Sequence, residues 1–204
     1  MITEALQHIL TNQKGGSLFL QFQPIFDLKS NEIVGFEALS RLSIKTLGTI
    51  SPVEFIPITE KTKMIIDLGL HIFKQALAFL KLLQKHGYTT LSVSINISAI
   101  QLLNPDFSKN ILQSIKAMRV DPSLVILEIT ESIFSSNYQE INRILGLLQE
   151  QGIKIAVDDF GTGYSSLARE RELHINTLKI DKFFIDKLLE LSDDQAITGD
   201  IVSM

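Results

Sequence analysis

Hydrophobic and polar positions divide the chain into a β-hairpin and a series of alternating strands and helices. Apolar and polar residues alternate through residues 18–26 (LFLQFQPIF) and again through residues 32–42 (EIVGFEALSRL). A short polar turn joins these segments, which is typical of two antiparallel strands. Residues 2–11 and 65–86 instead carry apolar side chains at helical spacing, and the second helix is expected to end at Gly87.

From residue 89 onward, predicted strands and helices alternate. The predicted strands are 89–98, 124–131, 153–161 and 175–181, and the predicted helices are 104–118, 138–151, a short one near Ser166 and one beginning at Ser192 or Asp193. This alternation is typical of βαβ units in a parallel sheet. No linker or low-complexity segment divides the chain, so we expect one α/β domain over residues 1–204.

Five predicted strands each carry a polar residue near the carboxyl end, on the face opposite their aliphatic side chains. Successive residues of a strand point to opposite faces, so the residue numbers alone assign each side chain to a face. In a barrel of parallel strands the polar faces meet at the barrel mouth, where such folds place their chemistry. The polar residues are Glu37, Asn96, Glu128, Asp158 and Lys179.

Four of these residues form a set of oxygen ligands. Three carboxylates and one amide carbonyl suit a hard cation such as Mg²⁺ or Mn²⁺; they belong to Glu37, Asn96, Glu128 and Asp158. Asp159 directly follows Asp158 and could hold a second ion, about 3.5–4 Å from the first, as phosphodiester hydrolysis favours. Lys179 would orient water or stabilise developing charge, and Arg41 is a candidate phosphate clamp.

Simpler explanations exist for two of these features. Asp158-Asp159 before a glycine loop also fits an exposed turn after an edge strand. Arg41 also fits an ordinary surface cation. Residues 159–161 (DFG) match the metal-binding tripeptide of protein kinases, but no glycine-rich loop or catalytic-loop signature accompanies them.

Composition and charge exclude several classes of function. The 204 residues are 45% hydrophobic with a net charge of −4, which gives no argument for a DNA, RNA or membrane-surface partner. Cysteine is absent and the four histidines lack zinc-site spacing. Charges interrupt the longest apolar region, 65–83, so it is no membrane segment, and the N-terminus shows no secretory signal. We therefore expect a cytoplasmic protein.

Seven ordered motifs resemble one family over nearly the whole chain. They are QPIFDL at 23–28, FEALSRL at 36–42, SPVEFIPITE at 51–60, INIS at 95–98, LEITES at 127–132, DDFGTGYSSL at 158–167 and LKID at 178–181. In these motifs the chain is similar to EAL domains, the bacterial cyclic di-GMP phosphodiesterases, whose name is spelled by Glu37-Ala38-Leu39.

The resemblance implies a TIM-like (β/α) barrel with one antiparallel strand and two-metal hydrolysis of cyclic di-GMP to linear pGpG. It implies Mg²⁺ or Mn²⁺ as cofactor, with Ca²⁺ inhibitory, and a homodimer. The implied metal ligands are Glu37, Asn96, Glu128, Asp158 and Asp159. Lys179 would assist the attacking water, Glu131 would hold the DDFGTG loop, and Gln23 and Arg41 would contact the substrate.

The resemblance stops before the end of the family's pattern. Six strands are predicted here, whereas the family continues with two more that carry a glutamate-rich motif. We therefore expect an incomplete barrel without its last two strands, weakly active or inactive as a monomer. The alternative function is a catalytically impaired EAL-type domain that binds cyclic di-GMP or a protein partner.

Overall fold

The computed structural model describes residues 2–11, 16–135, 137–160 and 173–187, and its centre is one mixed sheet. The strands are β1 (Gly16–Phe26), β2 (Ile33–Ile44), β3 (Gly48–Ile50), β4 (Ser92–Asn96), β5 (Val125–Thr130), β6 (Lys154–Phe160) and β7 (Thr177–Ile180). Their order is β1-β2-β4-β5-β6-β7, with β3 paired to β2. Every pair from β2–β4 to β6–β7 is parallel, which confirms the predicted parallel sheet.

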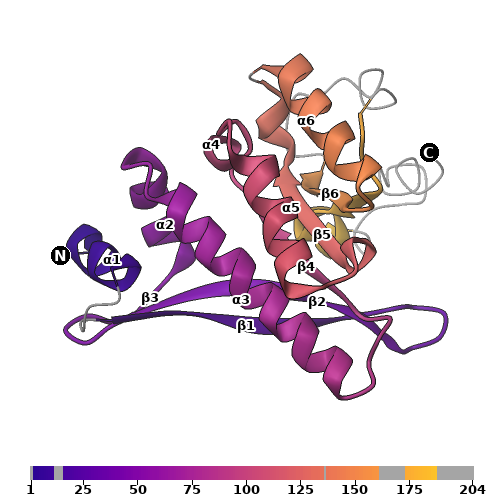
Figure 1. The fold of residues 1–204 in the computed structure, drawn as a ribbon, viewed down its shortest axis with the longest axis horizontal. Coiled ribbons are helices and arrows are strands. Elements are labelled where there is room, and N and C mark those ends of the chain that lie inside the picture. The colour runs from indigo at the N-terminus through magenta and orange to yellow at the C-terminus, as the bar shows by residue number, and fades with distance from the viewer. Residues whose placement is uncertain (1, 12–15, 136, 161–172, 188–204) are drawn as a thin grey trace.

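The predicted hairpin is the longest part of the sheet. β1 and β2 pair antiparallel from Gly16–Ile44 to Phe26–Ile33, and Figure 1 shows them as a long ribbon that extends beyond the other strands. β2 joins β4 only over Gly35 to Ala38. This strand therefore connects the antiparallel hairpin to the parallel part of the sheet.

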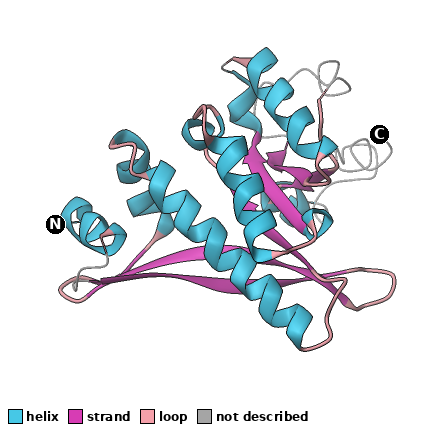
Figure 2. Ribbon diagram, in the orientation of Figure 1, coloured by secondary structure: helices cyan, strands magenta, loops and turns pink. Residues whose placement is uncertain are grey.

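Helices alternate with the strands from β4 onward, as predicted (Figure 2). They are α1 (Ile2–Leu10), α2 (Pro52–Lys61), α3 (Ile65–Lys85), α4 (Ala99–Leu102), α5 (Phe107–Met118), α6 (Tyr138–Glu150) and α8 (Lys182–Lys187), with 3₁₀ turns η1 (Pro122–Leu124) and η2 (Glu131–Ser135). Gly87 and Gly152, just after α3 and α6, have φ of +91° and +89°, conformations that glycine adopts at low cost.

One predicted helix is shorter in the structure, and a short helix that was not predicted precedes it. The segment expected at 104–118 begins at Phe107, and α4 precedes it as a separate short helix. Ser98 caps α4, because its hydroxyl accepts from the backbone N–H of Gln101 while the Gln101 side chain accepts from the backbone N–H of Ser98. The helices expected near Ser166 and from Ser192 or Asp193 lie outside the described residues.

The aliphatic face of the parallel strands forms the core with the helices. Six of its side chains are 2% exposed or less, namely Val93, Ile95, Leu127, Ile129, Ile155 and Val157. On the hairpin, Phe79 of α3 stacks on Phe22 with ring centroids 3.7 Å apart and meets Phe36 edge-on at 5.3 Å. The opposite face of the strands is therefore left for polar residues, as the alternation predicts.

Among the helices that the structure describes, none has the length and apolar character needed to cross a membrane.

Gly35 allows the close approach of β2 and β4, and we expect Gly35→Ala to destabilise the fold. An added Cβ would lie 2.4 Å from the Ser92 hydroxyl and 2.9 Å from the Ser92 carbonyl oxygen. Relief of this clash requires the paired strands to move, at an expected loss of about 1–3 kcal/mol in the free energy of unfolding. Urea denaturation measures the loss.

The double variant Gly35→Ala/Ser92→Ala is the matched control. It removes the hydroxyl clash but keeps the carbonyl clash, so it should recover only part of the lost stability. A Gly35→Ala protein as stable as the wild type would contradict the prediction.

Candidate metal centre

Side chains from four strands converge on one point of the polar face. The Lys179 ammonium nitrogen lies 2.7 Å from Glu128 Oε2, 3.0 Å from Asp158 Oδ2 and 3.4 Å from Glu37 Oε2. One oxygen from each carboxylate lies within 4.8 Å of the other two. Four of the five residues predicted from strand alternation therefore meet in space.

The fifth residue, Asn96, joins the same group through Glu37. Its side-chain amide nitrogen donates to Glu37 Oε1 at 3.1 Å, which leaves the amide oxygen as its ligand atom. Asn96 stands level with Glu128 in the β4–β5 pairing. Because the carboxyl ends of these parallel strands lie at the same end of the sheet, their last polar side chains lie close together there.

Burial and charge act on this group in opposite directions. The Glu128 side chain is only 1% exposed, and burial raises its pKa above the ordinary value against the opposing effect of Lys179. Burial acts to lower the pKa of Lys179, but hydrogen bonds with Glu128 and Asp158, together with the charges of Glu128 and Glu37, outweigh it and raise that pKa. The ammonium therefore remains charged and balances part of the carboxylate charge.

The donor set fits a hard divalent cation. Glu37, Glu128 and Asp158 supply carboxylate oxygens, and Asn96 supplies an amide oxygen. Mg²⁺ and Mn²⁺ prefer such oxygen ligands. The Lys179 ammonium lies among these carboxylates, so the site already attracts positive charge.

Asp159 is not part of this group of three carboxylates. Its φ of +55° interrupts the strand alternation, and its backbone N–H donates to Asp158 Oδ1 at 3.1 Å. Burial raises the pKa of Asp159, with further contributions from the charges of Asp158 and Asp181 and a hydrogen bond with Asp181. A role for Asp159 as ligand of a second ion remains a prediction.

The two predicted substrate contacts lie on the hairpin. Gln23 pairs directly with Glu37 across β1 and β2, so both side chains belong to the same face of the sheet. Arg41 is four residues beyond Glu37 on β2 and also shares that face. Its Nε donates to Gln21 Oε1 at 2.7 Å and its Nη1 donates to the Ser40 carbonyl at 2.9 Å.

Glu131 begins η2 directly after β5 and is 5% exposed. A buried carboxylate of this kind needs partners, which agrees with a structural role. Residues 161–163 of the loop that it is predicted to hold lie outside the described residues.

Sequence reasoning missed three residues that contact the site or its supports. Asp181 was quoted only as the end of the LKID motif, yet it lies beside Asp159. Gln21 could have been found, because it is two residues from Gln23 on the same face of β1. Asn176 precedes β7 and carries no periodic signal at all.

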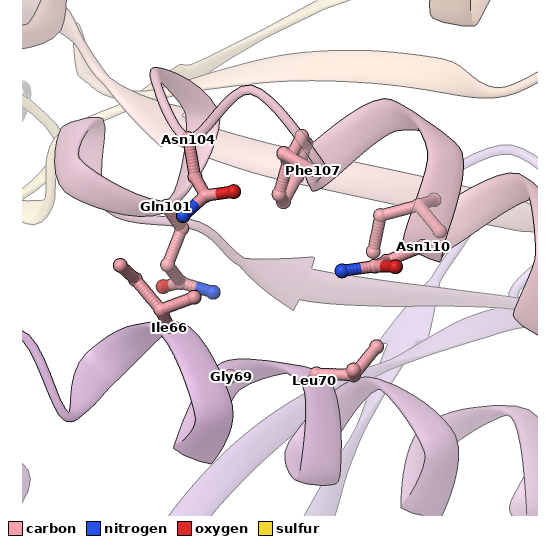
Figure 3. A pocket seen from close by; sticks show the side chains of 8 residues that line it. Ile66, Gly69, Leu70, Gln101, Asn104, Phe107 and Asn110 are labelled. Carbon is pink, nitrogen blue, oxygen red and sulfur yellow. The ribbon is translucent and has the colours of Figure 1, made fainter.

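The cavity drawn in Figure 3 lies away from this centre. It lies between α3 and the α4–α5 region, where Gln101, Asn104 and Phe107 face Ile66 and Leu70. None of the residues lining it belongs to the carboxylate group.

Comparison with known protein families identifies the fold. The family model of the EAL domain matches residues 3–204. The chain belongs to the EAL domain family. The mixed sheet with β1 antiparallel is accordingly that of a TIM-like barrel, and in the described residues the sheet runs openly from β1 to β7.

Curated relatives of this EAL domain are much longer proteins. The signaling protein YkoW of Bacillus subtilis is 39% identical over 185 residues, which are 91% of this chain and 23% of YkoW. The bifunctional diguanylate cyclase/cyclic di-GMP phosphodiesterase MucR of Pseudomonas aeruginosa is 34% identical over 92% of this chain and 27% of MucR. The chain thus spans about a quarter of the length of these relatives.

Solved EAL structures superpose on nearly the whole chain. The PaMucR phosphodiesterase in complex with c-di-GMP gives a TM-score of 0.90 at 33% identity, covering 99% of this chain and 81% of that one. The EAL enzyme Bd1971 bound to cAMP and cyclic-di-GMP gives a TM-score of 0.85 at 31% identity, covering 99% and 56%.

We expect Glu128→Gln to change how stability depends on pH when no divalent cation is added. A raised pKa means that the folded state holds the proton more tightly than the unfolded state. The contribution of Glu128 is therefore full below its ordinary pKa of 4.5 and falls as pH rises above it. Subtracting the variant's free energy of unfolding from the wild type's, in urea at pH 4 to 7, should give a declining difference.

Glu140→Gln is the control of opposite sign. Arg143 lowers the pKa of Glu140, so the contribution of this exposed residue is lost as pH falls, and the effect should be small. A wild-type advantage over Glu128→Gln that grows with pH would mean that pairing with Lys179 outweighs burial.

Proposed function

We propose that this EAL domain is a metal-dependent phosphodiesterase that hydrolyses cyclic di-GMP to linear pGpG. The observation that carries the proposal is the convergence of Glu37, Glu128 and Asp158 around the Lys179 ammonium. The similarity to PaMucR phosphodiesterase, solved as a c-di-GMP complex, supports the choice of substrate.

In this proposal Glu37, Asn96, Glu128 and Asp158 hold Mg²⁺ or Mn²⁺, and Asp159 adds a ligand for a second ion. Bound divalent ions supply two effects to such a hydrolysis, namely a lower pKa for bound water and neutralisation of phosphate charge. The protein's part is to fix the oxygen ligands on separate strands of a rigid sheet.

Lys179 and the hairpin residues act on the substrate directly in this scheme. The Lys179 ammonium stabilises negative charge that develops as water attacks the phosphorus. Arg41 presents its remaining N–H groups to a phosphate, because its Nε is already held by Gln21. Gln23, on the same face, contacts the nucleotide, and Glu131 supports the loop after β6.

A binding module without turnover is the second candidate. The position of Asp159 favours it, because this carboxylate lies beside Asp181 and outside the group of three carboxylates. Such a domain would bind cyclic di-GMP, or dock to a protein partner, with a weakened second metal position.

We also propose that the protein is cytoplasmic and forms a homodimer. Sedimentation velocity at several protein concentrations tests the dimer.

We expect Glu37→Ala and Asp158→Ala to lose metal binding and to lower turnover by several orders of magnitude, about 10³-fold or more, through lost charge stabilisation. Calorimetric titration with Mn²⁺ measures the first effect, and chromatographic detection of pGpG measures the second. Ca²⁺ should bind and inhibit. Glu140→Ala, a carboxylate remote from the group, is the control and should retain both properties.

These measurements separate the two candidates. Binding of Mn²⁺ and cyclic di-GMP without pGpG formation by the wild type would favour the binding module. Metal affinity that survives Glu37→Ala and Asp158→Ala would contradict the proposed centre.

We expect Lys179→Ala to lower kcat strongly while the affinity for cyclic di-GMP stays within a few-fold, because charge develops mainly in the transition state. Steady-state kinetics and equilibrium nucleotide binding measure the two quantities. Lys182→Ala is the control, since that side chain is 82% exposed and pairs with Asp186 instead. Lost affinity with unchanged kcat would show that Lys179 binds substrate and does not assist chemistry.

A further inference from the structure

The strand that carries Lys179 is short and irregularly paired. β7 comprises four residues, Thr177–Ile180. It pairs with β6 at Ala156–Thr177 and Val157–Leu178, and then the register shifts before Phe160–Ile180. Lys179 itself has no partner in this register. The β6–β7 pairing next to Lys179 therefore constrains the position of this residue only weakly, although its side chain contacts three carboxylates.

Asn176, directly before β7, supplies a second attachment to β6. Its backbone N–H donates to the Ile155 carbonyl at 2.8 Å. Its side-chain Oδ1 accepts from the Ile155 backbone N–H, also at 2.8 Å. One residue thus occupies both hydrogen-bonding groups of Ile155, as a paired strand would.

The same oxygen joins this attachment to α6. Gln149 Nε2 donates to Asn176 Oδ1 at 2.8 Å. Nearby, the backbone N–H of His174 donates to Asn142 Oδ1 at 2.9 Å. The His174 ring packs so closely on α6 that a Cβ at Gly146 would lie 2.9 Å from it. The start of β7 is therefore fixed to both a strand and a helix.

We propose that Asn176 is the positioning residue for Lys179. Asn176 holds Ile155, and three residues further along both strands Lys179 meets Asp158 at 3.0 Å. This side-chain clamp therefore sets the register and face of β7 two residue pairs before the register shifts. The kinetic part of this inference rests on the proposed function, and the geometric part does not.

Loss of this clamp has a defined consequence. A slip of one residue between strands would turn Lys179 to the opposite face of the sheet. Smaller displacements also matter, because about 1 Å of misplacement at a reacting group can lower the rate about 10²-fold. A residue that only stabilised the fold would not act selectively through Lys179.

Asn176→Asp and Asn176→Leu are a matched pair of variants. Aspartate keeps an oxygen that accepts from Ile155 and Gln149, whereas leucine has a similar size and no acceptor. Asn176→Ala, which also keeps the backbone bond to the Ile155 carbonyl, replaces the leucine variant if that protein does not fold. Gln149→Leu removes only the bond to α6 and is the control.

Kinetics give the first test. Asn176→Leu should lower kcat about 10²-fold with KM changed by less than about threefold, whereas Asn176→Asp and Gln149→Leu should stay near the wild type. In a Lys179→Ala background, Asn176→Leu should lower kcat no further. An equal effect in both backgrounds, or an equal loss in the aspartate variant, would overturn the proposal.

Two measurements need no turnover, so they decide the inference even if the proposed function fails. The Ile155 amide should lose protection from hydrogen exchange in Asn176→Leu and keep it in Asn176→Asp. The ¹⁵Nζ resonance of Lys179, assigned by its absence in Lys179→Ala, should sharpen only where the ammonium is held by the carboxylates. Retention of this signal and of Ile155 protection in Asn176→Leu would overturn the proposal.

Discussion

The repulsion among three carboxylates at one point of a largely buried face is the constraint on which this structure depends. Glu128 is 1% exposed, so water cannot compensate its charge, and the oxygens of Glu37 and Asp158 lie within 4.8 Å. A cation must therefore reach that point. The sheet supplies one from β7, the last described strand, and the ion pair of Lys179 with Glu37 connects β7 to β2 of the hairpin, which lies at the other end of the strand order.

The hairpin and the helices both help to position the charged residues of this group. β2 carries Glu37 between an antiparallel and a parallel neighbour, and the lack of a side chain at Gly35 leaves room for Ser92 of β4. At the other side of the sheet, α6 holds the segment before β7 through polar side chains. A helix that packs its apolar residues into the core thus also anchors the segment that leads into β7.

The parts of the site that follow strand alternation could be predicted from the sequence. Glu37, Glu128, Asp158 and Lys179 were found because a period of two holds whatever the tertiary context. Asp159 departs from that period, since its positive φ has no signature in the residue pattern. The short helix α4 was not predicted, although Ser98 and Gln101 have the Ser-x-x-Gln spacing of the capping box that starts it. Asn176 was invisible, because its partners Ile155 and Gln149 are 21 and 27 positions away.

The backbone at Asp159 is left-handed, so this residue must suit an unusual conformation as well as any chemical role of its carboxylate. Aspartate, asparagine and glycine tolerate this conformation, whereas β-branched residues adopt it only with strain. An alanine at this position would therefore mix the effect of a lost charge with that of an altered backbone, while asparagine would isolate the charge. A substitution at this aspartate therefore changes conformational preference as well as chemistry, and the two contributions must be separated before either is assigned to metal binding.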